Sequence, residues 1–296
     1  MNGEFSIDYC ISIDFQKLSE NPSRVFRAAS DLIDTFQELD INLARSIDTN
    51  IKPTILLQNI ESGSVKTWLR TILTSVDNEA LKSLDWKKFV GGYLVKGKEK
   101  VVEFLKDKEK ITERKQISDL QQEILQIAEQ TQVRQLPAYA PVPSYKLLKS
   151  IDSIATSLAH LHSSDKAVYI TSNGEFPFNL NFKIASEAVE DFATRETIEN
   201  DTRMILKIKK PDFLGESMWE FKHEKRTIIA KLLDFNWLNN FHNRKLNILP
   251  GDSIRAMVHT EVKYGYDNDV VAIHYSVTQV IEHLKVNNTN QQEFFS

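Results

Sequence analysis

The chain has 296 residues, and at about 150 residues per domain this length predicts two domains, each with its own core. Hydrophobic residues make up 41% and charged residues 26%, with nine glycines and eight prolines, which excludes collagen-like, mucin-like and disordered proteins. Because 37 basic side chains stand against 41 acidic ones, the net charge of −4 provides no overall attraction to nucleic acid or membrane, and any such binding must be local.

The cysteine content and the N-terminal sequence bear on the cellular location. Cys10 is the single cysteine, so no intramolecular disulfide can form, and the first ten residues lack the basic and apolar regions of a signal peptide. No apolar stretch approaches the roughly 20 residues that a membrane-spanning helix needs. We therefore expect a cytoplasmic protein without a transmembrane segment.

The first 75 residues predict a β-α-β-β unit. Apolar and polar residues alternate from Phe5 to Phe15, which is typical of a half-buried strand. A helix follows from Asn21 to Ile47, with Asn21 as its cap and apolar residues recurring every three or four positions. Two strands, 54–60 and 65–73, surround a turn that contains a glycine. We expect the helix to lie on one face of a small sheet.

The rest of the chain predicts a helical connector and a β-rich domain. Helical periodicity extends from about 77 to 133, and three prolines between 136 and 144 favour an extended linker. After a helix at 145–162, strand patterns and turns alternate and predict an antiparallel barrel or sandwich. The predicted organisation is an N-terminal α+β domain with helical connector at 1–136, a linker at 137–144, a helix plus β-rich domain at 145–286, and a flexible tail at 287–296.

A basic amphipathic segment lies between residues 86 and 110. Aromatic residues are interleaved with lysines there, a pattern that suits an anionic lipid surface or a phosphate backbone. Interleaved glutamates also fit ordinary ion pairing along a solvated helix. The candidate binding residues of this segment are Lys87, Lys88, Lys96, Lys98 and Lys100.

The same segment contains most of a phosphate-binding loop. Residues Gly92 to Lys98 match the first seven positions of G-x-x-x-x-G-K-[ST], but Glu99 occupies the eighth, where a hydroxyl must hold magnesium. The residues before Gly92 also read as a helix, whereas the motif follows a strand. We therefore expect no nucleotide here, and we assign the adjacent glycines at 91 and 92 to a kink or a close helix contact.

Catalytic motifs are not evident elsewhere. No G-x-S-x-G elbow occurs, and Cys10 has no neighbouring base. All seven histidines lie in the second half, and His259 and His274 fall in predicted strands where they can face each other only in a register that the sequence does not supply. A metal-dependent hydrolase or nuclease centred on Asp212, Glu220 and Lys222 remains an alternative. We otherwise expect no cofactor and no metal.

Aromatic residues of the β-rich domain supply the remaining candidate surface. Trp219 and Phe221 share one face of a predicted strand, and Asp234 is expected to cap a short helix that carries Trp237. These aromatics fit a structural core, and their alternative role is to line a binding surface.

The sequence as a whole favours a non-enzymatic binding or assembly protein. It would self-associate or recognise a protein or small ligand as an oligomeric scaffold or sensor, with an edge of the N-terminal sheet and the Phe5–Phe15 strand as the surface to mutate. One setting for such a protein is a bacterial conflict system, whose accessory proteins often lack familiar motifs. Nucleic-acid or anionic-membrane binding through the helix at 86–110 is the main alternative.

Overall fold

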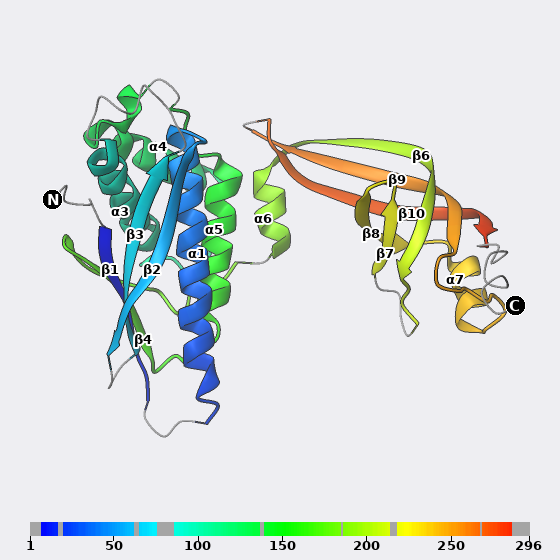
Figure 1. The fold of residues 1–296 in the computed structure, drawn as a ribbon, viewed down its shortest axis with the longest axis horizontal. Helices are drawn as coiled ribbons and strands as arrows, with labels where there is room; N and C mark the ends of the chain where they lie inside the picture. The colour runs from blue at the N-terminus through cyan, green and yellow to red at the C-terminus, as the bar shows by residue number, and fades with distance from the viewer. Residues whose placement is uncertain are drawn as a thin grey trace, which may run out of the picture. The chain divides into compact units, whose positions relative to one another are not determined.

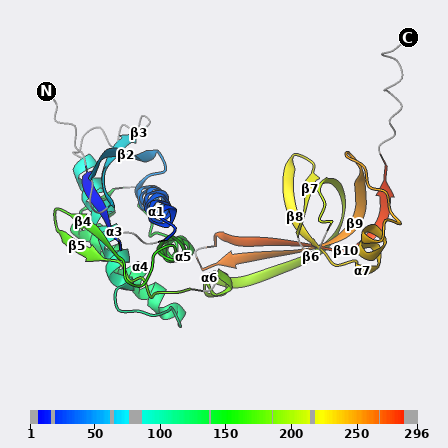
Figure 2. The ribbon, with the colours of Figure 1, turned by 90° about the horizontal axis from the view of Figure 1, so that it is seen from below.

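The computed structural model describes residues 7–16, 20–61, 65–75, 86–136, 139–184, 186–213, 218–266 and 268–285. The chain divides into two compact units, Met1–Ala193 and Thr194–Ser296 (Figures 1 and 2). The first unit combines helices with a five-stranded sheet, and the second contains a closed five-stranded barrel. The predicted α+β class with a C-terminal barrel is therefore confirmed.

The first unit is built on an antiparallel sheet with the strand order β2-β3-β1-β4-β5. Its strands are β1 (Ile7–Asp14), β2 (Ile51–Glu61), β3 (Val65–Ser75), β4 (Lys166–Thr171) and β5 (Gly174–Pro177). The alternation predicted for the first strand is present, since every second residue from Ile7 to Ile13 is buried. Because β1 pairs with β3 on one side and β4 on the other, it is the central strand and offers no free edge.

The helical elements of the first unit are α1 (Ser23–Ile47), α3 (Trp86–Leu105), α4 (Arg114–Gln130), the 3-10 turn η1 (Val133–Gln135), α5 (Ser144–Leu158) and α6 (Ser186–Ala193). Helices α1 and α3 pack against the sheet. The predicted apolar stripe of α1 is buried along its length. Phe36 of α1 and Lys98 of α3 both lie against the Tyr9 ring of β1, so the two helices cover the same face of the sheet.

A glycine allows α1 and α3 to approach each other closely. A Cβ atom at Gly97 would lie 2.9 Å from Cδ1 of Leu43, which is fully buried in α1. The same addition at Gly92 would meet only Thr131 at 3.8 Å, an ordinary contact. The close helix approach predicted near Gly91 and Gly92 is therefore made one to two turns later, at Gly97.

A buried carboxylate joins three elements of the first unit. Asp165, which precedes β4, accepts hydrogen bonds from both terminal nitrogens of Arg24 in α1. Backbone N–H groups of His162 and Gln16 also donate to it, at 2.8 and 3.3 Å. Burial raises the pKa of Asp165, but the hydrogen bonds from Arg24 and the two backbone groups, with the Arg24 charge, outweigh it and hold the pKa below its usual value.

We expect Asp165→Asn to lower the free energy of unfolding by about 2 kcal/mol at pH 7, because hydrogen bonds to a buried charge are lost. The folded-state pKa lies below the ~3.9 of an unfolded aspartate, so the stabilisation is complete above about pH 5 and disappears as the pH falls through the folded-state pKa. Urea unfolding at several pH values measures both effects. As a control, Asp8→Asn breaks an exposed pair with Arg70 and should cost at most about 1 kcal/mol.

The predicted domain boundary at 137–144 is wrong. Strands β4 and β5, which follow that segment, complete the sheet of the first unit, and the chain divides between Ala193 and Thr194 instead. The described part of the proline-rich segment packs on the first unit: the backbone N–H of Ala140 donates to the Ser46 carbonyl at 2.7 Å, and Val142 is buried. The prolines keep the segment extended, but these contacts fix it within one domain. The predicted tail lies outside the described residues.

The second unit is a closed barrel with the strand order β10-β8-β7-β6-β9. Its elements are β6 (Thr194–Lys210), β7 (Met218–His223), β8 (Arg226–Leu232), α7 (Phe235–His242), β9 (Ser253–Gly265) and β10 (Val270–Leu284). Four neighbouring pairs are antiparallel as predicted, and β8 and β10 are parallel. Asp234 caps α7 as expected, since its side chain accepts a hydrogen bond from the Trp237 backbone N–H at 3.0 Å.

Three strands of the barrel are much longer than the other two. Strand β6 pairs with β7 only at Lys207–Lys210, whereas it pairs with β9 from Thr194 to Lys207. The early part of β6 therefore continues with β9 and β10 as a three-stranded ribbon beyond the barrel (Figure 2). Most residues of β6 before Leu206 are exposed, so this ribbon has two accessible faces.

Candidate functional site

The lysines predicted to form a basic surface on α3 do not share one exposed face. Lys98 is fully buried, which contradicts its predicted role in surface binding. Lys88 is exposed, Lys87 and Lys96 are half-buried, and Lys100 pairs with Glu103 at 2.7 Å. Because one of the five lysines is in the core and another is neutralised on its own helix, α3 lacks the continuous basic surface that the sequence suggested.

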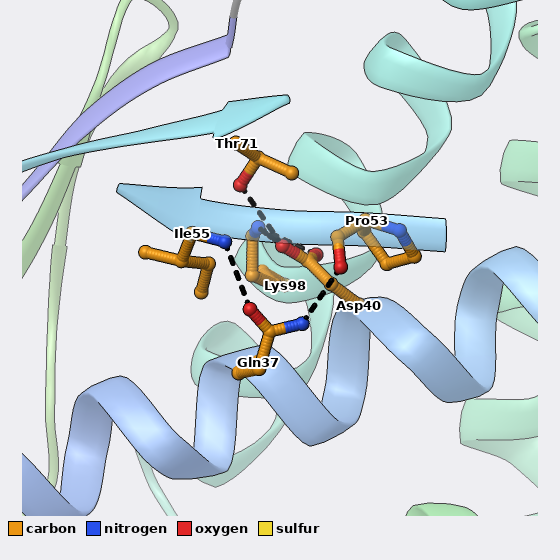
Figure 3. Close-up of polar contacts among 6 residues, drawn as sticks. All are labelled: Gln37, Asp40, Pro53, Ile55, Thr71 and Lys98. Carbon is orange, nitrogen blue, oxygen red and sulfur yellow. Dashed lines mark hydrogen bonds and ion pairs between the residues drawn. The ribbon is translucent and has the colours of Figure 1, made fainter. Parts of the chain in front are cut away.

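Lys98 instead forms a bidentate ion pair inside the first unit (Figure 3). Its Nζ lies 2.6 and 2.7 Å from the two carboxylate oxygens of Asp40 in α1, and both side chains are completely buried. The Thr71 hydroxyl of β3 donates to the same carboxylate at 3.1 Å. The ammonium also lies 4.6 Å from the centre of the Tyr9 ring, a favourable cation–π distance.

The electrostatics of this pair resemble those of an active site, but its burial assigns it to the core. Burial raises the pKa of Asp40 and lowers the pKa of Lys98, while the attraction between the two groups opposes both shifts. Strongly shifted groups mark functional sites when they line a cleft that a substrate can enter. Neither side chain has exposed surface, so we interpret the pair as the polar link between α1, α3 and β3.

The partial phosphate-loop motif is part of the same packing. Its lysine, Lys98, points into the core, and Glu99 accepts hydrogen bonds from the Thr171 hydroxyl at 2.6 Å and the Asn173 amide at 2.9 Å. These contacts attach α3 to the turn between β4 and β5. The expectation that this segment binds no nucleotide phosphate is consistent with that geometry, since the lysine has no access to a ligand.

Two of the three aromatic candidates in the second unit form its core. Trp219 and Phe221 are fully buried inside the barrel, so their predicted role in a binding surface is wrong. The prediction that both side chains lie on the same side of β7 was correct, but the barrel closes over that side. Trp237 packs against Trp219 at 5.7 Å between ring centres and is half-buried. It lines an open hollow of about 870 Å³ together with Asp234 and His259.

The outer surface of the barrel carries a basic patch that the sequence analysis did not identify. Lys207 of β6 lies opposite Lys222 of β7, and Lys231 of β8 lies opposite Met218. With Lys209, these four exposed lysines form what we call the basic barrel face. Glu220 is the single acidic residue that points outward from the described parts of β7, β8 and the end of β6 from Lys207 onward. It pairs with Lys209.

The sequence does not predict the basic barrel face directly, because each strand contributes only one or two of its lysines. The segment Leu206 to Lys209 alternates apolar and basic residues, which is the available sequence signal for a strand with a basic outer side. Two of the three residues of the hydrolase alternative lie here: Glu220 is paired with Lys209, and Lys222 points outward beside Lys207. That alternative and its link to Asp212 stay a prediction.

The environment of Cys10 does not suit a nucleophile. Burial raises the pKa of the Cys10 thiol to about 11, and the nearby Glu61 charge adds to the effect, so the reactive thiolate is disfavoured.

Among the helices of the described ranges, none has the length and hydrophobicity to cross a lipid bilayer.

Searches of protein families, curated proteins and solved structures found no match to this chain. The barrel nevertheless has a defined topology: three antiparallel strands, a helix, and two further strands, with the third strand parallel to the fifth. Five strands closed in this order form a small Greek-key barrel. Since one fold can support many functions, any function must be argued from the residues on its surface.

Proposed function

We propose that this protein is a non-enzymatic binding protein and that its barrel binds single-stranded nucleic acid. The observation that carries the proposal is the basic barrel face, formed by Lys207, Lys209, Lys222 and Lys231. The strand order of this barrel resembles that of the OB-fold, whose barrels recognise oligonucleotides and oligosaccharides on the face of their second and third strands, the counterparts of β7 and β8. Lysines along such a face contact phosphates without sequence preference.

Exposed apolar side chains on the same face support this function. Met218 and Ile229 are 48% and 56% exposed, and both point outward from β7 and β8 between the lysines. Unpaired bases offer apolar surfaces to such side chains, whereas the bases of a duplex are stacked inside it. The combination therefore favours a single strand over a duplex, although no described aromatic residue of β7 or β8 points outward to stack on a base.

The test is the fluorescence anisotropy of a labelled single strand of about 16 nucleotides, the upper site size of one such barrel. Lys209 is paired with Glu220, so if Lys207, Lys222 and Lys231 each contact a phosphate, log Kd should rise with log salt with a slope of about 2.1, or about 18-fold between 50 and 200 mM salt. Absence of binding at low salt, or binding that does not depend on salt, would refute the proposed function.

A second candidate function is self-association through the edge strand β2. Gln37 of α1 occupies the beginning of this edge: its amide accepts from the Ile55 N–H at 2.8 Å and donates to the Pro53 carbonyl at 3.0 Å (Figure 3). Beyond this point, Leu57 and Ile60 are 59% and 58% exposed. An apolar strand edge favours pairing with a second copy of itself about a two-fold axis.

We expect the double variant Leu57→Lys/Ile60→Lys to be monomeric under conditions where the wild-type chain forms a dimer, because charged side chains block edge-to-edge pairing. Light scattering on a gel-filtration column measures the mass of each. The matched variant Ile205→Lys/Ile229→Lys changes two exposed isoleucines in the second unit and should retain the dimer. A wild-type chain that is monomeric at all concentrations tested rules out this candidate.

A further inference from the structure

One face of the three-stranded ribbon aligns several potential metal ligands. Glu199 of β6 lies opposite Glu261 of β9, and Asp201 lies opposite His259. His274 of β10 lies opposite Glu261 on its other side. Directly opposed residues project to the same face of a sheet, so the strand register makes His259 and His274 diagonal neighbours. This is the register that the sequence alone did not supply for the two histidines.

Three of these side chains converge on a small volume. Nε2 of His259 lies 3.6 Å from a carboxylate oxygen of Glu261 and 4.0 Å from one of Glu199. One ligand atom from each of the three residues lies within 4.8 Å of the others. Two atoms that each bind a tetrahedral zinc ion at about 2.1 Å are about 3.4 Å apart, so small side-chain rotations complete the geometry.

The other ring nitrogen of His259 supplies an independent indication. Nδ1 lies 2.9 Å from a carboxylate oxygen of Asp201. A carboxylate that accepts the Nδ1 proton fixes the ring orientation and directs the Nε2 lone pair toward Glu199 and Glu261. Histidines that ligate metals almost always have this kind of partner on the nitrogen that faces away from the ion.

The local charge also favours a cation. Carboxylate oxygens of Asp201, Glu261 and Glu199 lie 2.9, 3.6 and 4.0 Å from the ring nitrogens of His259, so three negative charges surround one imidazole. Opposed carboxylates such as Glu199 and Glu261 destabilise neighbouring strands, and a shared divalent ion relieves this repulsion. Two basic residues, Lys263 and Arg203, lie in the next strand pairs on the same face, one on each side of the cluster.

We propose that Glu199, Glu261 and His259 bind a divalent transition-metal ion of the Zn²⁺ type, with Asp201 orienting His259 and His274 positioned to supply a fourth ligand. The mixture of imidazole and carboxylate suits Zn²⁺, whereas Ca²⁺ requires a larger set of oxygen ligands. The proposed ion links β6, β9 and β10 at one point of the ribbon. This site is separate from the basic barrel face and does not depend on nucleic-acid binding.

Isothermal titration of the full chain with Zn²⁺ tests the proposal. We expect one site per chain, loss of that site in His259→Gln, and binding about 10–100-fold weaker in Asp201→Asn, since a partner that orients a ligand typically contributes that much. His274→Gln tests the fourth ligand and should weaken binding at least about tenfold. Ca²⁺ should give no heat of binding.

The matched control is His223→Gln, which removes a histidine of β7 outside the ribbon and should bind Zn²⁺ as the wild type does. Because the altered side chains are partly or fully exposed, circular dichroism should show that every variant keeps the fold. Equal Zn²⁺ binding by the wild type and His259→Gln would overturn the proposal, since the ion would then occupy other groups. A wild-type chain that gives no heat with Zn²⁺ would overturn it as well.

Discussion

Replacing Asp40 by leucine should lower the free energy of unfolding by about 3–5 kcal/mol, because the Lys98 ammonium would remain in the core without its counterion. The leucine also leaves the Thr71 hydroxyl without its acceptor. The cost is large because both charged groups are completely buried, so water cannot replace the lost partner. Urea unfolding followed by circular dichroism measures the change.

The double variant Asp40→Leu/Lys98→Met distinguishes a lost ion pair from a damaged core. Apolar residues that replace a whole buried pair are often neutral or stabilising, so the double variant should recover most of the stability that Asp40→Leu loses. As a control, Lys100→Met removes a partly exposed pair with Glu103 on the same helix and should cost at most about 1 kcal/mol. A loss below 1 kcal/mol in Asp40→Leu would contradict the buried-pair interpretation.

The buried pair also shows what the sequence did and did not predict. The apolar stripe of α1 and the alternation of β1 were predicted correctly, because each follows the periodicity of a single element. Lys98 was assigned to the surface because it lies in a lysine-rich segment, and its burial results from contact between two helices. The available signal was Asp40, a charge within the apolar stripe of α1, four residues after Phe36 and three before Leu43.

Long-range pairing accounts for the other differences. The contact between β1 and β4 joins residues about 150 positions apart, and no local pattern indicates it, so the proline-rich segment was taken as a domain boundary. Trp219 and Phe221 were correctly placed on one side of a strand, but barrel closure determines which side becomes the core. The same limit applies to His259 and His274, because a register shift of one residue would put them on opposite faces.

The largest functional effect is expected from reversing the charge of the basic barrel face. The variant Lys207→Glu/Lys209→Glu/Lys222→Glu/Lys231→Glu should lose measurable binding to the labelled single strand at physiological salt. Replacing Lys207, Lys222 or Lys231 alone should weaken binding and lower the salt slope by about 0.7, since each would contact one phosphate, whereas Lys209 is already paired with Glu220. All four side chains are exposed, so the barrel core and its thermal unfolding should change little.

A variant with the same charge change on the other unit provides the control. Lys88→Glu/Lys106→Glu/Lys110→Glu/Lys115→Glu alters exposed lysines in and after α3, the region where the sequence predicted anion binding. It should bind with nearly wild-type affinity, because local lysines on the barrel, and not the net charge, make the phosphate contacts. If this variant loses binding while the barrel variant retains it, the nucleic-acid site belongs to the first unit. Equal losses in both would show that binding follows net charge and has no defined site on the barrel.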